Sequence, residues 1–111
     1  MIRVQRGRRV WARDRPTDLR KGFAGLAGLI EQEMRHDLVK GDIFVFISRS
    51  RRLIKLLAWD GTGLVLYSKR LARGQFAEVW RRRQGDQIAL SPRQLRELLA
   101  GVDLTRAGGW R

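Results

Sequence analysis

The stretch "FVFISRSRRLIKLLAWDGTGLVLYSKR", residues 44–70, decides the fold. It holds three apolar runs separated by two polar segments, "SRSRR" (48–52) and "DGTG" (60–63). Asp-Gly between two runs rich in leucine, valine and aromatic residues is a strong signal for a β-hairpin. We therefore predict strands over 43–47, 53–59 and 64–70, with the first apolar on both faces and central in its sheet.

The hairpin register predicts which loops meet. If "DGTG" forms the loop, Trp59 lies opposite Leu64, and counting back places Leu53 opposite Arg70. The loop 48–52 and the segment 69–73 must then lie at the same end of the sheet, which we call the basic end. No acidic residue occurs between Asp42 and Asp60, or between Asp60 and Glu78. We predict that the basic end gathers seven cations: Arg49, Arg51, Arg52, Lys55, Lys69, Arg70 and Arg73.

The composition favours a polyanionic partner. The chain has 111 residues, enough for one domain over 1–111, and a net charge of +13. Of its 24 basic residues all but four are arginines, whose planar guanidinium fits phosphate oxygens. Nucleic acid is the leading partner and an anionic membrane surface the second. A charge run is more often only a solvated surface, but two loops that converge favour a binding site.

The remaining sequence predicts an α+β fold. Thr17 is expected to cap a long helix whose apolar stripe runs Leu19, Phe23, Leu26, Ile30 and Met34. Gly22, Gly25 and Gly28 in that helix are expected to let another backbone approach closely. Near the C-terminus, Ser91, Pro92 and Gln94 form a capping box for a short helix that Gly101 ends. We expect a small, mostly antiparallel sheet of about four to six strands, packed by the long helix and the short C-terminal helix.

Three further segments carry weaker signals. Residues 1–16 form either a basic arm or, around Val10 and Trp11, a short strand. Short strands are also predicted near 76–79 and at 87–90, with the basic loop "WRRRQGD" (80–86) between them.

Nothing in the sequence favours catalysis. His36 lacks a nucleophile pattern nearby and is predicted to lie on the surface after the long helix. Asp42 and Asp60 are predicted to be turn residues, and the carboxylates show no metal-ligand spacing. We expect no enzyme, no metal and no cofactor, with a metal-dependent nuclease that uses Asp60 as the third-ranked alternative. Trp59 and Tyr67 are interpreted as core residues rather than base-stacking platforms.

The chain has no cysteine, its first fifteen residues contain no apolar core of the kind that a signal peptide needs, and no apolar run approaches the length of a membrane span. We therefore expect a soluble cytosolic protein without a membrane partner.

Three motifs resemble a known family. "TDLRKGFAGL" (17–26), "FVFISRSRRLIKLLAWDGTGLVLYSKRLARGQF" (44–76) and "LSPRQLRELLAGVDL" (90–104) are similar to the TnpB accessory proteins of the insertion-sequence-66 family of bacterial transposable elements. The resemblance runs in order from Thr17 to Leu104. It implies a bacterial, nucleoid-associated accessory factor, encoded beside a separate transposase that carries the acidic catalytic triad.

Arg20 and Lys21 join the predicted DNA-contacting residues for a different reason. In the first turn of a helix they oppose the helix dipole, and an anion bound at that terminus would explain them.

Two functions from different classes follow. The first is a non-catalytic factor that supports transposition and binds DNA at the element ends or target through the basic end. The second is an assembly protein whose main partner is the transposase or the element's other accessory protein. The sequence leaves open the DNA sequence preferred, the oligomeric state, and whether single strands, duplexes or RNA are bound.

Overall fold

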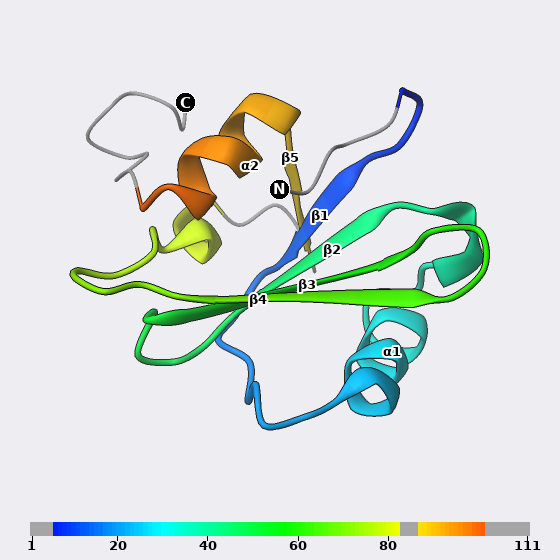
Figure 1. Cartoon of the computed structure of the whole chain (residues 1–111), viewed down its shortest axis with the longest axis horizontal. Coiled ribbons are helices and arrows are strands. Elements are labelled where there is room, and N and C mark those ends of the chain that lie inside the picture. The colour runs from blue at the N-terminus through cyan, green and yellow to red at the C-terminus, as the bar shows by residue number, and fades with distance from the viewer. Residues whose placement is uncertain (1–5, 83–86, 102–111) are drawn as a thin grey trace.

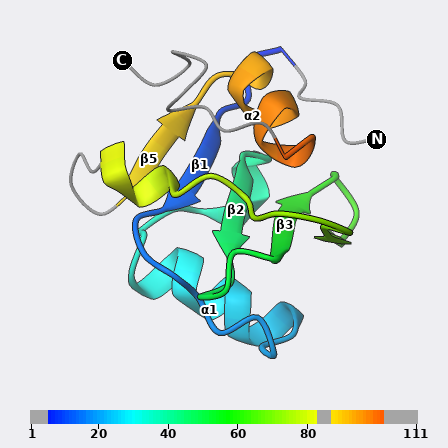
Figure 2. The same cartoon turned by 90° about the vertical axis from the view of Figure 1, so that its left-hand side faces the viewer.

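The computed structural model describes residues 6–82 and 87–101, and within them five strands form one sheet (Figure 1). Its order is β4-β3-β2-β1-β5, with helix α1 against one face and α2 against the other (Figures 1 and 2). The elements are β1 (Val10–Arg13), α1 (Phe23–Gln32), the 3-10 turn η1 (Leu38–Lys40), β2 (Ile43–Ile47), β3 (Leu53–Trp59), β4 (Leu64–Arg70), the 3-10 turn η2 (Val79–Arg82), β5 (Gln87–Leu90) and α2 (Pro92–Leu99).

The strand pairing confirms the predicted hairpin register. Trp59 lies opposite Leu64, and Leu53 lies opposite Arg70. The pairs β2–β3, β3–β4 and β1–β5 are antiparallel, whereas β1 runs parallel to β2. The sheet is therefore mixed but mostly antiparallel, and α1 belongs to the connection that parallel strands require.

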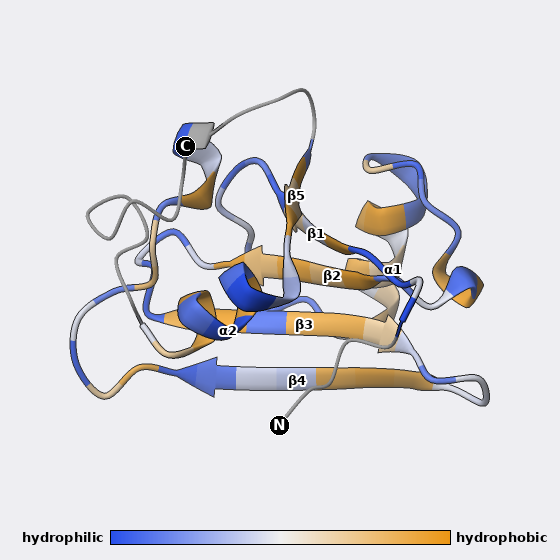
Figure 3. Cartoon of the chain, turned by 90° about the horizontal axis from the view of Figure 1, so that it is seen from above, coloured by the Kyte–Doolittle hydropathy of each residue, from blue (hydrophilic) through white to orange (hydrophobic). Residues whose placement is uncertain are grey.

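Strand β2 is buried at every position because both faces of the sheet are covered. Ile43, Val45 and Ile47 pack in the core that α2 closes, whereas Phe44 and Phe46 pack in the core that α1 closes. This alternation follows from the two-residue period of a strand. Figure 3 shows the apolar colouring running along β2 and β3, with the polar end of β4 beside them.

The predicted long helix is wrong. Helix α1 begins only at Phe23, after Gly22, and has no side-chain cap. Thr17 is held elsewhere: its N–H donates to the Ile47 carbonyl (2.9 Å) and its hydroxyl accepts from the Arg13 guanidinium (3.3 Å). These contacts hold the segment 14–22 against the sheet. The backbone of this segment is therefore not free to form the first turns of the predicted helix.

The apolar stripe of this segment is buried as predicted except at its second residue, whereas the glycines differ from expectation. Leu19, Leu26, Ile30 and Met34 are buried, and Phe23 is 47% exposed. A Cβ at Gly22 or Gly28 would meet no neighbouring described atom within 4 Å, and the three atoms nearest to a Cβ at Gly25 belong to the Lys21 side chain. The predicted close approach of another backbone is therefore wrong at Gly22 and Gly28, and at Gly25 the nearest contact is a side chain.

The C-terminal helix matches its prediction. The Ser91 hydroxyl accepts from the Gln94 N–H and the Gln94 side chain accepts from the Ser91 N–H, which completes the capping box. Gly101 follows the helix with φ +83°, the left-handed conformation that glycine adopts at low cost.

The outer segments give mixed outcomes. Residues 10–13 form β1 between β2 and β5, so the arm interpretation does not hold for them, and residues 1–5 lie outside the described residues. The strand at 87–90 is confirmed. The strand predicted near 76–79 is wrong, because the Phe76 N–H donates to the Arg51 carbonyl and η2 begins at Val79. Of the predicted basic loop 80–86, residues 83–86 lie outside the described part of the chain.

Candidate nucleic-acid interface

The two basic loops do meet at one end of the sheet, as the register predicts. The Leu71 N–H donates to the Arg52 carbonyl (3.0 Å), which continues the β3–β4 pairing past the strands. The Gln75 side-chain amide donates to the Ser50 carbonyl (3.0 Å). Figure 2 looks onto this end, where the two loops lie beside each other.

Arg51 holds these two loops together. We call it a committed cation, because its guanidinium is already bonded to other residues of the protein. Its guanidinium donates to the Phe76 carbonyl and to the Gln75 side chain, both at 3.1 Å, and lies 3.6 Å from a Glu78 carboxylate oxygen. The residue adopts φ +59°, a conformation that costs energy for a residue with a Cβ. Such a backbone persists when surrounding contacts fix it, and the contacts of this guanidinium do so.

Lys55 and Lys69 are also committed, on opposite faces of the sheet. The Lys55 ammonium donates to the Leu19 carbonyl (2.8 Å), which anchors the segment before α1. The Lys69 ammonium donates to the Leu99 carbonyl (2.7 Å) at the end of α2. A cation at a helix C-terminus satisfies a free carbonyl and complements the helix dipole.

Four cations of the predicted set point to solvent: Arg49, Arg52, Arg70 and Arg73. None of these four side chains makes a hydrogen bond or an ion pair with another described residue. The predicted set of seven thus divides into three cations that hold the fold and four that a partner could reach. We call these four the exposed arginines.

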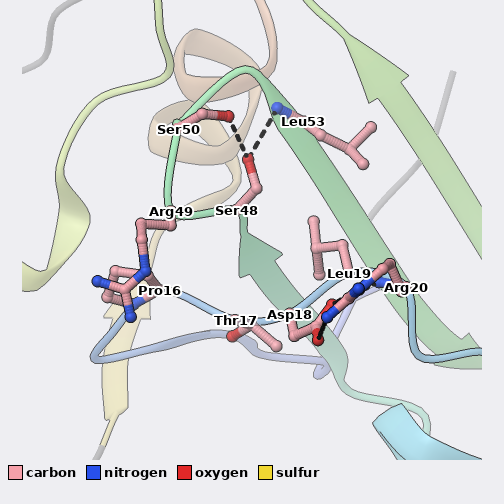
Figure 4. Close-up of a pocket in the computed structure, with 9 residues that line it drawn as sticks. All are labelled: Pro16, Thr17, Asp18, Leu19, Arg20, Ser48, Arg49, Ser50 and Leu53. Carbon is pink, nitrogen blue, oxygen red and sulfur yellow. Dashed lines mark hydrogen bonds and ion pairs between the residues drawn. The ribbon is translucent and has the colours of Figure 1, made fainter.

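The segment before α1 reaches the same end of the sheet. Residues 16–20 and 48–50, together with Leu53, line a cavity of about 550 Å³ (Figure 4). The Thr17 N–H bond to Ile47 places this segment beside the loop. Arg20 therefore lies near the loop 48–52, a neighbourhood that the sequence did not reveal.

The helix-dipole argument for Arg20 and Lys21 is wrong, since both residues precede α1. Arg20 instead forms a two-pronged ion pair with Asp18, at 3.0 Å and 2.8 Å. The hydrogen bonds from Arg20 hold the pKa of the Asp18 carboxyl far below its usual range, so this carboxylate stays ionised. Lys21 is exposed beside Gly25, and the structure brings it into no contact with the basic end.

The serines of the loop are site residues that the sequence analysis missed. Ser48 Oγ accepts from the Leu53 N–H (3.2 Å) and lies 3.3 Å from Ser50 Oγ. Figure 4 shows both hydroxyls inside the turn, with Ser48 Oγ between Ser50 Oγ and the Leu53 N–H. The alternation of serine and arginine in "SRSRR" was the available signal, because small hydroxyl side chains both close turns and bind polar ligands.

Four residues outside the basic end were given roles from the sequence, and the structure shows the contacts that each of them makes. His36 is not a free surface residue: its ring lies 4.9 Å from that of Trp11 and 5.3 Å from that of Phe44. Asp60 is a turn residue as predicted, whereas Asp42 accepts from the Arg9 N–H and the Trp11 indole and so links β1 to the start of β2. Tyr67 packs against the core closed by α2.

In the part of the chain that the structure describes, no three His, Cys, Asp or Glu side chains lie close enough to hold a metal ion. No helix within residues 6–82 and 87–101 is long and apolar enough to cross a bilayer.

Comparison with known proteins gives the family. A family model described as "IS66 Orf2 like protein" matches residues 8–108. The chain belongs to this family. Membership confirms the resemblance drawn from the three motifs and makes the protein a transposition-associated accessory protein.

Two similar proteins come from Sinorhizobium fredii (strain NBRC 101917 / NGR234). The uncharacterized protein y4hO is 43% identical over 95 residues, which cover 86% of this chain and 81% of that protein. The uncharacterized protein y4jC is 34% identical over 106 residues, which cover 96% and 89% of the two chains. No solved structure gives a significant match.

Proposed function

We propose that this IS66 Orf2-like protein is a non-catalytic accessory factor that binds DNA through the exposed arginines at the basic end. The observation that carries the proposal is the distribution of charge there. The nearest carboxylates are already paired, Asp18 with Arg20 and Glu78 with Arg51 and Arg81. The positive charge of the exposed arginines is therefore directed at solvent.

Phosphate contact is the chemistry that fits this surface. A guanidinium binds phosphate oxygens through two parallel hydrogen bonds and keeps its charge at any physiological pH. Each phosphate that a cation neutralises releases counterions, so affinity falls steeply with salt and depends little on sequence. With a net charge of +13 the protein also gains from a polyanion that relieves its self-repulsion.

The test is a double substitution, Arg49→Ala with Arg52→Ala, measured by fluorescence anisotropy with duplex DNA across a salt series. The expected result is weaker binding of unrelated sequences alike. The slope of log affinity against log salt should become shallower by about 0.9 for each phosphate that the variant no longer neutralises.

The matched control removes the same charge elsewhere. Arg8→Ala with Lys40→Ala removes two exposed cations that precede β1 and β2. We expect a smaller loss of affinity and of salt slope, because the parallel strands β1 and β2 begin at the end of the sheet opposite to the basic end. Equal effects of the two double variants would mean that net charge alone binds DNA, and the assignment to the basic end would be wrong.

A second candidate function, assembly with the transposase, is favoured by the outer side of α1. Residues 22–34 contain no lysine or arginine, although the chain as a whole is strongly basic. Phe23 is 47% exposed at the start of this helix, and Ala24 beside it is also exposed. A helix with apolar residues on its solvent side is typical of a surface that another protein covers.

This second candidate is tested by co-purification with the transposase after nuclease treatment. Phe23→Asp should abolish a complex that survives without DNA, whereas Val65→Asp, at an exposed apolar site on β4, should not. Loss of the complex on nuclease treatment alone would instead leave DNA binding as the sole link between the two proteins.

A further inference from the structure

The cavity beside the exposed arginines has a shape that duplex DNA does not require. The outer surface of a duplex is convex, and its phosphates contact charged side chains on a surface or ridge. The cavity lined by 16–20, 48–50 and Leu53 is instead a hollow of about 550 Å³, within the size range of small-molecule sites. A nucleotide that stands out from the duplex is a group of the size that it can take.

The lining combines an apolar floor with free polar groups. Pro16, Leu19 and Leu53 supply apolar surface, and Leu19 is buried beneath it. The hydroxyls of Ser48 and Ser50 form one hydrogen bond with each other, and the Ser48 hydroxyl also accepts from the Leu53 N–H. Whichever of the two hydroxyls donates, the O–H of the other stays free to donate to a ligand.

The two sides of the cavity differ in charge. The Arg49 guanidinium lies on the Pro16 side, exposed to solvent, while the Asp18–Arg20 pair lies on the other side (Figure 4). Asp18 is 48% exposed and accepts three hydrogen bonds from Arg20, and its carboxylate oxygens have further acceptor sites for N–H groups. A phosphate is therefore favoured beside Arg49, whose side chain forms no ion pair with a described residue, and the N–H groups of a nucleobase are favoured beside Asp18.

We propose that this cavity binds one unstacked nucleotide of a single-stranded or frayed DNA end, with its phosphate at Arg49 and its base toward Asp18. The proposal rests on the DNA binding proposed above and narrows the DNA bound to ends with unpaired nucleotides. An already unpaired nucleotide enters without the cost of unstacking a duplex, a few kcal/mol. An unstacked base gains from stacking on a guanidinium plane and from hydrogen bonds to its exposed edge.

The test compares two labelled probes of equal duplex length, one blunt and one with a short single-stranded extension, by anisotropy at fixed salt. The wild-type protein should bind the extended probe on the order of tenfold more tightly, the effect of about one charge-assisted hydrogen bond. Extensions on the 3′ and the 5′ strand are measured separately, and a preference for either supports the proposal.

Two variants locate the preference in the cavity. Ser50→Leu narrows the cavity without adding an aromatic ring, and should lower affinity for the extended probe more than affinity for the blunt probe. Its control is Thr62→Leu, at a likewise exposed site in the hairpin at the other end of β3, which should keep the preference. Asp18→Asn removes the carboxylate and frees Arg20, so affinity for the blunt probe should rise as the preference falls.

The outcomes separate this proposal from the one on which it rests. Equal wild-type affinity for the two probes, with a normal salt dependence, would overturn the nucleotide site and leave DNA binding by the exposed arginines intact. Failure to bind either probe would overturn both. A preference that persists in Asp18→Asn and Ser50→Leu would show that the unpaired nucleotide binds elsewhere on the protein.

Discussion

The two turns that flank β3 are built in opposite ways. In the turn at 60–63, Asp60 Oδ1 accepts from the Thr62 N–H (2.9 Å), the Thr62 hydroxyl (3.0 Å) and the Gly63 N–H (2.9 Å). Every one of these hydrogen bonds lies within four residues. The turn at 48–52 is closed locally by Ser48, but its position depends on Arg51, which reaches Gln75 and Phe76.

The comparison shows that the number of cations in a sequence segment can exceed the number that are exposed to a binding partner. Of the three arginines in "SRSRR", Arg51 is used inside the protein, and Arg49 and Arg52 are exposed. The turn at 60–63 needs no such support and carries no cation. A basic turn that is fixed by one of its own cations presents the others in a defined position, which suits recognition better than a flexible charged loop.

The largest effect is expected from Arg51→Ala, which should lower the free energy of unfolding by about 2 kcal/mol. The substitution leaves the buried Phe76 carbonyl without its charged donor and keeps the unfavourable positive φ. Urea unfolding at neutral pH measures it, and Arg49→Ala is the control. A decrease below about 0.5 kcal/mol would mean that the loop 48–52 is held by other interactions.

A smaller effect is expected from Lys69→Met, about 1 kcal/mol, because one charge-assisted hydrogen bond to the end of α2 is removed while the aliphatic packing is kept. Arg70→Met, one residue on and exposed, is the control and should change the unfolding free energy by less than about 0.5 kcal/mol. Equal decreases would contradict the division into committed and exposed cations.

The self-contained turn at 60–63 offers a test by pH. Hydrogen bonds from the Thr62 and Gly63 N–H groups lower the pKa of the Asp60 carboxyl in the folded protein. Its stabilising contribution is therefore present above the unfolded pKa of about 3.9 and is lost as the pH falls through the lowered folded pKa. Asp60→Ala should be less stable than wild type at pH 7, and less affected than Lys69→Met because the carboxylate is exposed.

Unfolding measured from pH 7 down to pH 2 checks the Asp60→Ala prediction. The difference between variant and wild type should narrow below about pH 4. A difference that stays constant across this range would show that the turn is stabilised by something other than the ionised carboxylate.

The smallest effect on stability is expected from Arg52→Ala, within about 0.5 kcal/mol, since its side chain forms no hydrogen bond or ion pair with another described residue. Its effect should fall on DNA binding instead, with a salt slope shallower by up to about 0.9. Urea unfolding and DNA-binding anisotropy are measured on the same preparation of each variant. Arg51→Ala should show the opposite result, with a larger loss of stability than of salt slope.

The sequence predicted those parts of the fold that depend on neighbouring residues. The register from Trp59 opposite Leu64 follows from the "DGTG" loop, and the α2 start follows from Ser91 and Gln94. The long helix failed because the competing partner of Thr17, the Ile47 carbonyl, lies thirty residues away. A pattern of apolar spacing does not contain that hydrogen bond, and tertiary hydrogen bonds override local propensity.

The sequence predicted where the candidate site lies, but not which of its cations are exposed. The register brought the two loops together, and family membership agrees with the motifs used. Lys55 and Lys69 donate to the backbone carbonyls of Leu19 and Leu99. Every residue has a backbone carbonyl, so the sequence does not indicate which of them a lysine will contact. Which cations are exposed and which are committed therefore became visible only in the structure, as did the cavity that residues 16–20 form with the loop.

The late position of β5 and α2 in the chain has a consequence for synthesis and turnover. The core against α2 is completed by Ile88, Leu95 and Leu98, while its other wall, including Val10 and Val45, is made much earlier. A chain interrupted after β4 leaves that apolar wall open to water, to chaperones and to proteases. Incomplete copies are therefore expected to be degraded faster than complete ones, and the amount of folded protein should follow the number of chains that are translated to the end.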